Sequence, residues 1–465
     1  MKNQYSKGMK NFKRIIFAAG LSFISQTSLF AQDNAMFDVM DDKSKFVLNE
    51  QIINGSSKYI NKKGDEVKSN PIYKLSLDER VKKGITSVVK SNPKLSNKNQ
   101  TSTTFTVTFL DVANATGYGF DDPTAGATRR ATIEQAVAYY ANIITNTGSA
   151  DIEIQESENI SGYALAWGGQ YYFSTPGFQN GTVWRHIITG VDPSSTLADG
   201  LVTYNFYYTF NDDYNRLPTS SEYDLYTVSI HELGHAFGFT SMSNSDGSSQ
   251  ISSGVYSSYD EYLQSDNYSD LFTTTGGQNS AATFSSSSSE LATDGVVFDF
   301  GNGSYGAVYS PNPFNSSSLD HFDSNRLTDG TKYLMHPSLS KGVVVREMHE
   351  QEAKVLEQIG YSINFNNIST STVNNHISNA NNVAMFPNPI VTGNNLNLIV
   401  TTEKEQNITT VIYDVLGNVI YKQNNLVSQS SPSVQLPINN SIASGTYFVQ
   451  VQGDVVSQKQ MLIIE

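Results

Sequence analysis

Hydrophobic and polar positions in the middle of the chain recur with the periods of a mixed α/β domain. Residues 105–110 alternate apolar with polar side chains, which predicts a β-strand. Residues 127–145 repeat apolar side chains at helical spacing, which predicts an amphipathic helix. The ranges 151–154, 163–167 and 205–210 have the composition of further strands. This order, followed by another helix, predicts an α+β domain built on a twisted mixed sheet.

The next helix carries two histidines and has sequence signals at both ends. Pro218 prevents a helix from continuing from upstream. Two pairs of residues can form a capping box at its start: Thr219 with Glu222, or Ser221 with Asp224. Gly238 can end the helix, because glycine readily adopts the left-handed conformation found at helix termini. We therefore expect the chain to turn sharply just beyond His235.

Stretches of small polar residues divide the rest of the chain. Residues 241–290 are rich in Ser, Gly, Asn and Thr, and we expect an insertion there with little core of its own. Residues 364–382 have a similar composition and predict a linker. Beyond the linker, residues 383–465 contain short alternating segments separated by turn residues. That pattern predicts a small all-β, Ig-like sandwich.

The composition suits a secreted protein of several units. A chain of 465 residues is too long for one compact core. Its net charge of −14 argues against a nucleic-acid partner, which would require a basic face. Cysteine is absent, so disulfides, thiolate metal ligands and a cysteine latch on a metal are all excluded.

The amino-terminal end has the layout of a secretory signal peptide. Basic residues precede an apolar stretch at 15–24, and Ala31 offers a cleavage site, so residues 1–31 are expected to be removed. The apolar stretch is too short for a membrane anchor, and no other segment approaches the length of a span. Residues 32–100 are polar and lysine-rich. They fit either a pro-segment that covers a site until export or a disordered spacer.

The chemistry is concentrated in His231, Glu232 and His235. Histidines four positions apart lie above one another on one helical face, so both imidazoles can reach one metal ion. The glutamate beside the first histidine can hold the water on that metal, as in the His-Glu-x-x-His arrangement of zinc peptidases. A catalytic zinc needs three protein ligands and one open position. The third ligand must therefore come from elsewhere.

Residues further along the chain make 105–361 resemble a leishmanolysin-type metzincin. In that branch a long insertion separates the glycine of the helix motif, here Gly238, from the third histidine, and a methionine turn follows. His321 and Met335 occur in this order after the insertion. The chain departs from leishmanolysin in having no cysteines and in its own serine-rich insertion.

The resemblance implies a zincin/metzincin-type catalytic domain over residues 101–363. It implies one catalytic zinc, held by His231, His235 and His321. Met335 would pack beneath the zinc site without binding the metal. Asp320 or Asp323 could orient an imidazole as a hydrogen-bond acceptor.

Two other residues compete with His321 for the third position. In the general metzincin motif that position falls at Ser241, which is a poor zinc ligand. His336 directly follows the turn methionine, and a side chain there normally points away from the metal. Glu261 would complete the site as a glutamate does in thermolysin-like enzymes, but Gly238 and Met335 would then have no purpose.

These features predict a secreted zinc-dependent metalloendopeptidase that hydrolyses protein or peptide substrates. A zinc-bound water would attack the peptide bond, with Glu232 as general base. The alternative is a non-catalytic surface adhesin or binding protein on a decayed protease scaffold, for which Ser241 is the only support. Calcium would suit a secreted protease without cysteines, but no loop carries a recognisable calcium-binding pattern.

The carboxyl-terminal residues resemble the sorting domain of the type IX secretion system. The resemblance is carried by the Phe-Pro-Asn-Pro opening at 386–389 and by the Ser-Gly-Thr-Tyr-Phe-Val segment at 444–449. It implies export across the outer membrane by that machinery, followed by removal of the tail. The mature protein would be secreted or held at the cell surface without a membrane span. The alternative is an ordinary Ig-like binding module that the mature protein keeps.

Overall fold

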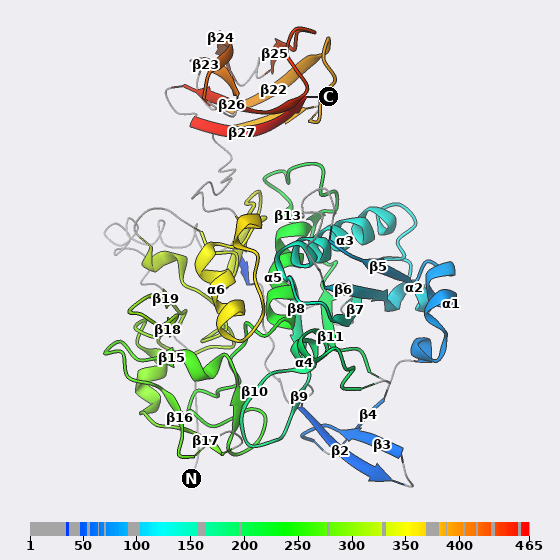
Figure 1. Ribbon diagram of the computed structural model, residues 1–465, viewed down its shortest axis with the longest axis vertical. Helices are drawn as coiled ribbons and strands as arrows, with labels where there is room; N and C mark the ends of the chain where they lie inside the picture. Colours follow the sequence, from blue (N-terminus) through cyan, green and yellow to red (C-terminus); the bar gives the residue numbers. More distant parts are fainter. Residues whose placement is uncertain are drawn as a thin grey trace, which may run out of the picture. The chain divides into compact units, whose positions relative to one another are not determined.

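The structure is a computed structural model of the chain (Figure 1). It describes residues 34–36, 47–91, 103–156, 164–194, 197–276, 280–327, 332–368 and 381–464, with short gaps at 54–55, 64, 69–70, 387, 403–404, 415–416, 429–432 and 454–456. The expected signal peptide and most of the expected linker lie outside the described residues. Among the helices that are described, none combines the length and the apolar character that a membrane span requires.

A five-stranded mixed sheet underlies the domain that carries the two motif histidines. The strands are β5 Thr86–Val89, β6 Thr104–Phe109, β7 Ser149–Glu156, β11 Gly200–Tyr204 and β8 Ala166–Gln170, in that spatial order. Strands β6, β7 and β11 run parallel, and β5 and β8 are antiparallel at the two edges. Buried side chains alternate along β7 at Ala150, Ile152 and Ile154, because successive side chains in a strand point to opposite faces.

Two helices pack together against this sheet. Helix α3 Gly126–Ile143 matches the predicted helix, and its apolar residues Ile133 and Val137 are fully buried. Helix α5 Leu225–Ala236 carries the motif histidines and contacts both α3 and β8 (Figure 1). The Tyr140 hydroxyl on α3 donates to the Ile230 carbonyl on α5 at 2.6 Å. Helix α5 is therefore enclosed between α3 and the edge of the sheet.

The strand expected at residues 205–210 is wrong. The strand is β11, which ends at Tyr204, and only the two-residue β12 Phe210–Asn211 follows. Asn205 ends β11, because its amide donates to the Ala164 carbonyl at 3.1 Å and accepts from the Tyr207 N–H at 3.2 Å. Phe206 and Tyr208 pack against the core instead of pairing as a strand, and Tyr207 is exposed.

The start of helix α5 also differs from the prediction. Strand β13 Tyr223–Asp224 pairs with β12, so the chain stays extended as far as Asp224. Asp224 is the N-cap, and its carboxylate accepts from the Thr227 N–H at 3.1 Å. Both expected capping boxes are therefore wrong. Gly238 does end the helix as predicted, with a φ of 105° just after the C-cap Phe237.

The insertion at 241–290 contributes more to the core than its composition predicts. Tyr259 is fully buried, and its ring lies 5.2 Å from Phe239 and 5.0 Å from Phe298. Leu263 and Phe272 join the same core. A few large residues supply this packing, so the surrounding serines and glycines conceal it in the sequence. The elements of the insertion are β14 Val255–Ser257, η3 Asp260–Tyr262, β15 Leu263–Gln264, β16 Phe272–Thr274, β17 Ala282–Phe284 and η4 Ser288–Ala292.

The remaining elements of this domain are short. They are α2 Leu110–Asn114, β10 Gly177–Gln179, α4 Thr182–Thr189, β18 Val297–Asp299, β19 Tyr305–Ala307, η5 Ser324–Arg326, β20 Ser338–Ser340, α6 Glu350–Gln358 and η6 Phe365–Asn367. Strands β15, β18 and β19 form a small antiparallel sheet that joins the insertion to the chain after it.

Part of the region expected to be a pro-segment or spacer is folded. Its elements are β1 Asn34–Met36, β2 Val47–Ile53, β3 Ser56–Ile60, β4 Glu66–Val67, η2 Pro71–Lys74 and α1 Leu77–Lys82. Strand β2 pairs in parallel with β9 Tyr172–Phe173, and β5 is an edge strand of the main sheet. The described part of this region is thus packed on the domain that follows it, and a boundary at residue 100 stays a prediction.

The carboxyl-terminal residues form two antiparallel sheets around a separate core. The strands are β21 Asn381–Phe386, β22 Asn395–Thr402, β23 Gln406–Asp414, β24 Val419–Val427, β25 Ser433–Pro437, β26 Gly445–Gln452 and β27 Ser457–Ile464. Their spatial orders are β21-β22-β25 and β24-β23-β26-β27. Leu398, Ile412 and Leu462 are fully buried between them. The short alternating segments of the sequence therefore form strands.

Replacing Gly168 with alanine tests how closely β8 packs on α5. An added Cβ would lie 2.1 Å from the Glu232 carbonyl oxygen. Overpacking of this kind costs about 1–3 kcal/mol, so we expect Gly168→Ala to lower the free energy of unfolding by at least about 1 kcal/mol in a denaturant titration. Gly445→Ala is the control, since its nearest contact is the Tyr447 ring at 3.8 Å. Equal stability of the two variants would contradict the close packing.

Candidate metal centre

Helix α5 holds His231 and His235 side by side in a buried position. All 12 residues of the helix are buried, and the two imidazoles are 0% and 1% exposed. Their ring centroids lie 4.8 Å apart, and the two Nε2 atoms are separated by 3.1 Å. The helix is fixed at its start, where Arg346 binds the capping carboxylate of Asp224 at 2.7 Å and 2.9 Å. The spacing of four residues therefore places both rings on one face, as the sequence predicts.

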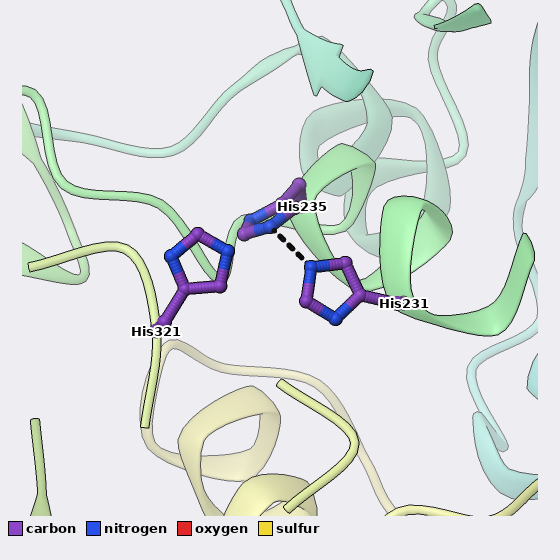
Figure 2. A group of neighbouring side chains, drawn as sticks. All are labelled: His231, His235 and His321. Carbon is purple, nitrogen blue, oxygen red and sulfur yellow. Dashed lines mark hydrogen bonds between the residues drawn. The ribbon is translucent and has the colours of Figure 1, made fainter. Parts of the chain in front are cut away.

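His321 reaches the same point from a distant loop (Figure 2). Its ring centroid lies 5.2 Å from that of His231 and 4.9 Å from that of His235. One ligand atom from each of the three histidines lies within 4.8 Å of the others. The Tyr309 N–H donates to the His321 carbonyl at 2.8 Å, which fixes the loop against the chain that follows β19. The structure thus brings together the three histidines that the metzincin resemblance selects.

Each of the three rings is oriented by a backbone carbonyl. The contacts from Nδ1 are His231 to Leu334 at 2.7 Å, His235 to Phe239 at 2.7 Å and His321 to Ser317 at 2.8 Å. A carbonyl oxygen can only accept, so Nδ1 carries the proton in each ring. In a neutral imidazole Nε2 is then bare and offers a lone pair. The expectation that Asp320 or Asp323 would orient an imidazole is wrong.

Burial keeps the rings of His231 and His321 neutral. The pKa of His231 is lowered well below its usual value by burial and then by His235. The pKa of His321 is lowered well below its usual value by burial and then by the two other histidines. Neutral imidazole is the form that binds a metal.

The donor set fits a divalent cation. The bare Nε2 atoms of His231 and His235 face each other at 3.1 Å, where two lone pairs repel unless a positive charge lies beside them. The Nε2 of His321 is buried and has no hydrogen-bond partner among the described residues. An orphaned buried nitrogen is costly, and a cation removes that cost. Three neutral imidazoles and an open position are the ligand set of a catalytic zinc.

Ser241 has a structural role in place of the missing ligand. Its hydroxyl donates to the Asp260 carboxylate at 2.5 Å, and its N–H donates to the Asp320 carboxylate at 2.6 Å. Burial raises the pKa of Asp260 to about 6, although Ser241, Met242 and Ser257 all donate to its carboxylate. Ser241 therefore links the end of the helix motif to the residue preceding His321.

Met335 packs directly against the helix that carries the histidines. A Cβ placed on Gly234 would lie 2.7 Å from the Met335 sulfur, so the Met335 side chain would have to shift to admit a larger residue. The adjacent Leu334 carbonyl is the acceptor for His231, and the Met335 N–H donates to the Glu352 carboxylate at 2.6 Å. Burial raises the pKa of Glu352 to about 8 against the lowering effect of its backbone hydrogen bonds. Sequence reasoning missed Glu352, whose only sequence signal is its place in the first turn of α6.

The two rival ligands lie outside the three-histidine cluster. Glu261 is exposed, on the turn η3. His336 accepts from the Ser324 N–H through Nδ1 at 3.3 Å. Among the described residues, neither rival shares a metal-binding group with His231 and His235.

Comparison with known proteins identifies the carboxyl-terminal domain. Residues 384–465 match the secretion system C-terminal sorting domain family. No curated protein matches the chain. The chain carries a sorting domain at the expected place, and it is exported through the type IX secretion system to the cell surface or beyond.

Three solved structures each resemble a small part of the chain. PorZ, a surface component of the type IX secretion system of Porphyromonas gingivalis, shares 19% identity over 18% of this chain and 11% of its own, with a TM-score of 0.15. Dimeric latent PorU from the same organism shares 15% identity over 18% and 9%, with a TM-score of 0.15. A DUF3244-family protein with an immunoglobulin-like β-sandwich from Bacteroides vulgatus shares 20% identity over 17% and 78%, with a TM-score of 0.13. The chain therefore spans about a tenth of the first two proteins.

Replacing His321 with alanine tests the third ligand. We expect the zinc affinity of the three-histidine cluster to fall more than about 100-fold in a chelator competition, since loss of a residue that only orients a ligand already costs roughly 10–100-fold. Glu261→Ala and His336→Ala are the controls and should bind zinc as the native chain does. Zinc that is retained in His321→Ala and lost in Glu261→Ala would contradict the assignment.

The raised pKa of Glu352 makes stability depend on pH. The folded chain holds this proton up to a pKa of about 8, whereas the unfolded chain releases it near 4.5. Its contribution to stability is therefore fully present below pH 4.5 and is lost as the pH rises to about 8. We compare the metal-free native chain with metal-free Glu352→Gln by denaturant titration between pH 4.5 and about 8. Over this range the free energy of unfolding should fall by roughly 1–3 kcal/mol less in Glu352→Gln than in the native chain. Parallel curves for the two chains would contradict this prediction.

Proposed function

We propose that this exported protein is a zinc-dependent endopeptidase whose active centre is the three-histidine cluster. The observation that carries the proposal is that three buried histidines each place one ligand atom within 4.8 Å of the others, and that the Nε2 of His321 has no hydrogen-bond partner among the described residues. Glu232 follows His231 directly on α5 and is itself fully buried. A metal-binding triad with a carboxylate beside it supports peptide hydrolysis more specifically than it supports a structural metal site, which would be closed by a fourth protein ligand.

When bound, zinc would lower the pKa of a water molecule and polarise the carbonyl of the scissile peptide. Glu232 takes the proton of the attacking water and delivers it to the leaving amine. Its burial excludes competing solvent from the carboxylate. The charge of Glu232 also raises the pKa of Tyr204, after the larger effect of burial. The Glu232 carboxylate is therefore close enough to Tyr204, the last residue of β11, to act on it electrostatically. The backbone carbonyls of Leu334, Phe239 and Ser317 keep the three imidazoles in the metal-binding tautomer.

Strand β8 supports the binding of an extended substrate. It is the last strand of the main sheet and pairs with β11 on one side. An edge strand of this kind can pair with a peptide through main-chain hydrogen bonds. Gly168 on this strand lies directly against the carbonyl of Glu232, so a peptide paired with β8 would pass close to the active-site helix.

We also propose that the full chain is latent. His231, Glu232, His235 and His321 are at most 1% exposed, so a polypeptide cannot reach them without movement of the covering elements. Val47 on β2 is buried among Met242, Ile251 and Val255 of the insertion. Lys62 donates to the Gln250 carbonyl at 2.7 Å. The region 47–91 therefore holds the insertion in place, as a pro-segment would until it is processed.

The alternative, a non-catalytic surface protein, has less support than the enzyme. It rested on Ser241 as a sign of decay, whereas Ser241 connects two buried carboxylates, those of Asp260 and Asp320. A residue with that structural role does not indicate a lost ligand. Glu232, the residue that only catalysis needs, is present on the buried helix.

Replacing Glu232 with glutamine tests the proposed function. The variant keeps the three histidines, so we expect zinc content to stay at the native level. Loss of a general base lowers turnover by about 10²–10⁴-fold, which can be measured on a generic protein substrate after processing of the amino-terminal region. Glu261→Gln is the matched control and should keep native activity.

Native turnover by Glu232→Gln would contradict the assignment of the general base. Zinc content at the native level, with no proteolysis by the processed native chain, would instead support a non-catalytic metal-binding protein. The two measurements together therefore separate the enzyme from the surface protein.

A further inference from the structure

A second cluster of metal-binding side chains lies at the end of helix α4. His186 on α4, Asp192 in the following loop and Asp199 just before β11 each place one ligand atom within 4.8 Å of the others. His186 and Asp199 are 9% and 2% exposed, and Asp192 is exposed. None of the three belongs to the proposed active centre, and the sequence pattern gave none of them a role.

The ring of His186 is held between a hydroxyl and a carboxylate. Its Nε2 lies 3.0 Å from the Ser149 hydroxyl, and its Nδ1 lies 2.6 Å from the Asp199 carboxylate. If the proton is on Nε2 and is donated to Ser149, Nδ1 carries no proton and points at the Asp199 carboxylate. Metal-binding histidines commonly donate their other ring nitrogen to an outer partner in this way.

The cluster carries more negative charge than its histidine can balance. Asp199 and Asp192 both act electrostatically on His186. Even a protonated imidazole supplies only one positive charge to these carboxylates. Oδ1 of Asp199 is buried and has no hydrogen-bond partner among the described residues. An unsatisfied buried carboxylate oxygen is costly, and a divalent cation satisfies it while neutralising the excess charge.

We propose that His186, Asp192 and Asp199 form a second divalent-cation site, which takes a metal of the zinc type. The mixed nitrogen and oxygen donors favour zinc over calcium or magnesium, which prefer oxygen ligands alone. The ion cross-links the end of α4, the following loop and the start of β11, so it stabilises the fold. Ser149, His186 and Asp199 also have the hydrogen-bond order of a charge-relay triad, but a triad leaves Asp192 without a purpose.

The test uses the full chain and Zn²⁺ as the probe, in a background where the active centre is disabled. His321→Ala removes a ligand of the first site, and Asp192→Asn then removes a ligand of the second. In the native chain the Ser194 N–H donates to the Asp192 carboxylate at 2.8 Å. The side-chain oxygen of asparagine can accept the same hydrogen bond. Asp213→Asn is the matched control, because Asp213 accepts from the Asn215 N–H at 2.8 Å in the same kind of turn and belongs to neither cluster.

We expect His321→Ala to retain about one equivalent of zinc per chain, together with a zinc-dependent rise in the midpoint of thermal unfolding. Adding Asp192→Asn should abolish both, and adding Asp213→Asn should change neither. Equal zinc content in the two double variants would overturn the proposal and identify His186 and Asp199 as an ion pair. The two single variants separate the two proposals. If Asp192→Asn lowers the zinc content and His321→Ala does not, the result would support this site and refute the proposed active centre.

Discussion

Three hydrogen bonds from imidazole Nδ1 atoms to backbone carbonyls determine what the centre of this molecule can do. The acceptors are the carbonyls of Leu334, Phe239 and Ser317. Because carbonyls cannot donate, these bonds leave all three Nε2 atoms bare and turned toward one another. Burial lowers the pKa values of His231 and His321 and so disfavours their protonation. In the proposed function, a cation at the point where the lone pairs meet would stabilise this arrangement.

Much of the surrounding structure holds those carbonyls in place. The Leu334 carbonyl depends on the loop that Glu352 binds through the Met335 N–H. The Phe239 carbonyl follows the helix end at Gly238, whose φ of 105° turns the chain back toward His235. Close packing completes the frame, since an added Cβ would lie 2.1 Å from the Glu232 carbonyl oxygen at Gly168 and 2.7 Å from the Met335 sulfur at Gly234. Packing and polar contacts therefore serve the same end, which is a fixed orientation of three rings.

Local sequence patterns predict some elements of the fold and two of the three histidines. The other features depend on contacts between distant segments. Helical spacing alone places His231 beside His235, and alternation alone identifies β6. His321 could be chosen only through resemblance, because a loop far along the chain has no periodicity that reports where it lies. The helix cap at Asp224 was missed because it depends on the pairing of β12 with β13, which lie on either side of a long turn. Glu352 was missed because its partners are backbone N–H groups of another segment.

Anomalous diffraction from zinc-loaded crystals of the native chain is the most direct measurement of the central claim. The account predicts a zinc peak with three nitrogen ligands at roughly 2.0–2.1 Å, the Nε2 atoms of His231, His235 and His321, and one position left for solvent. A peak that includes Glu261 or His336 in place of His321 would contradict the account. So would the absence of zinc between these rings.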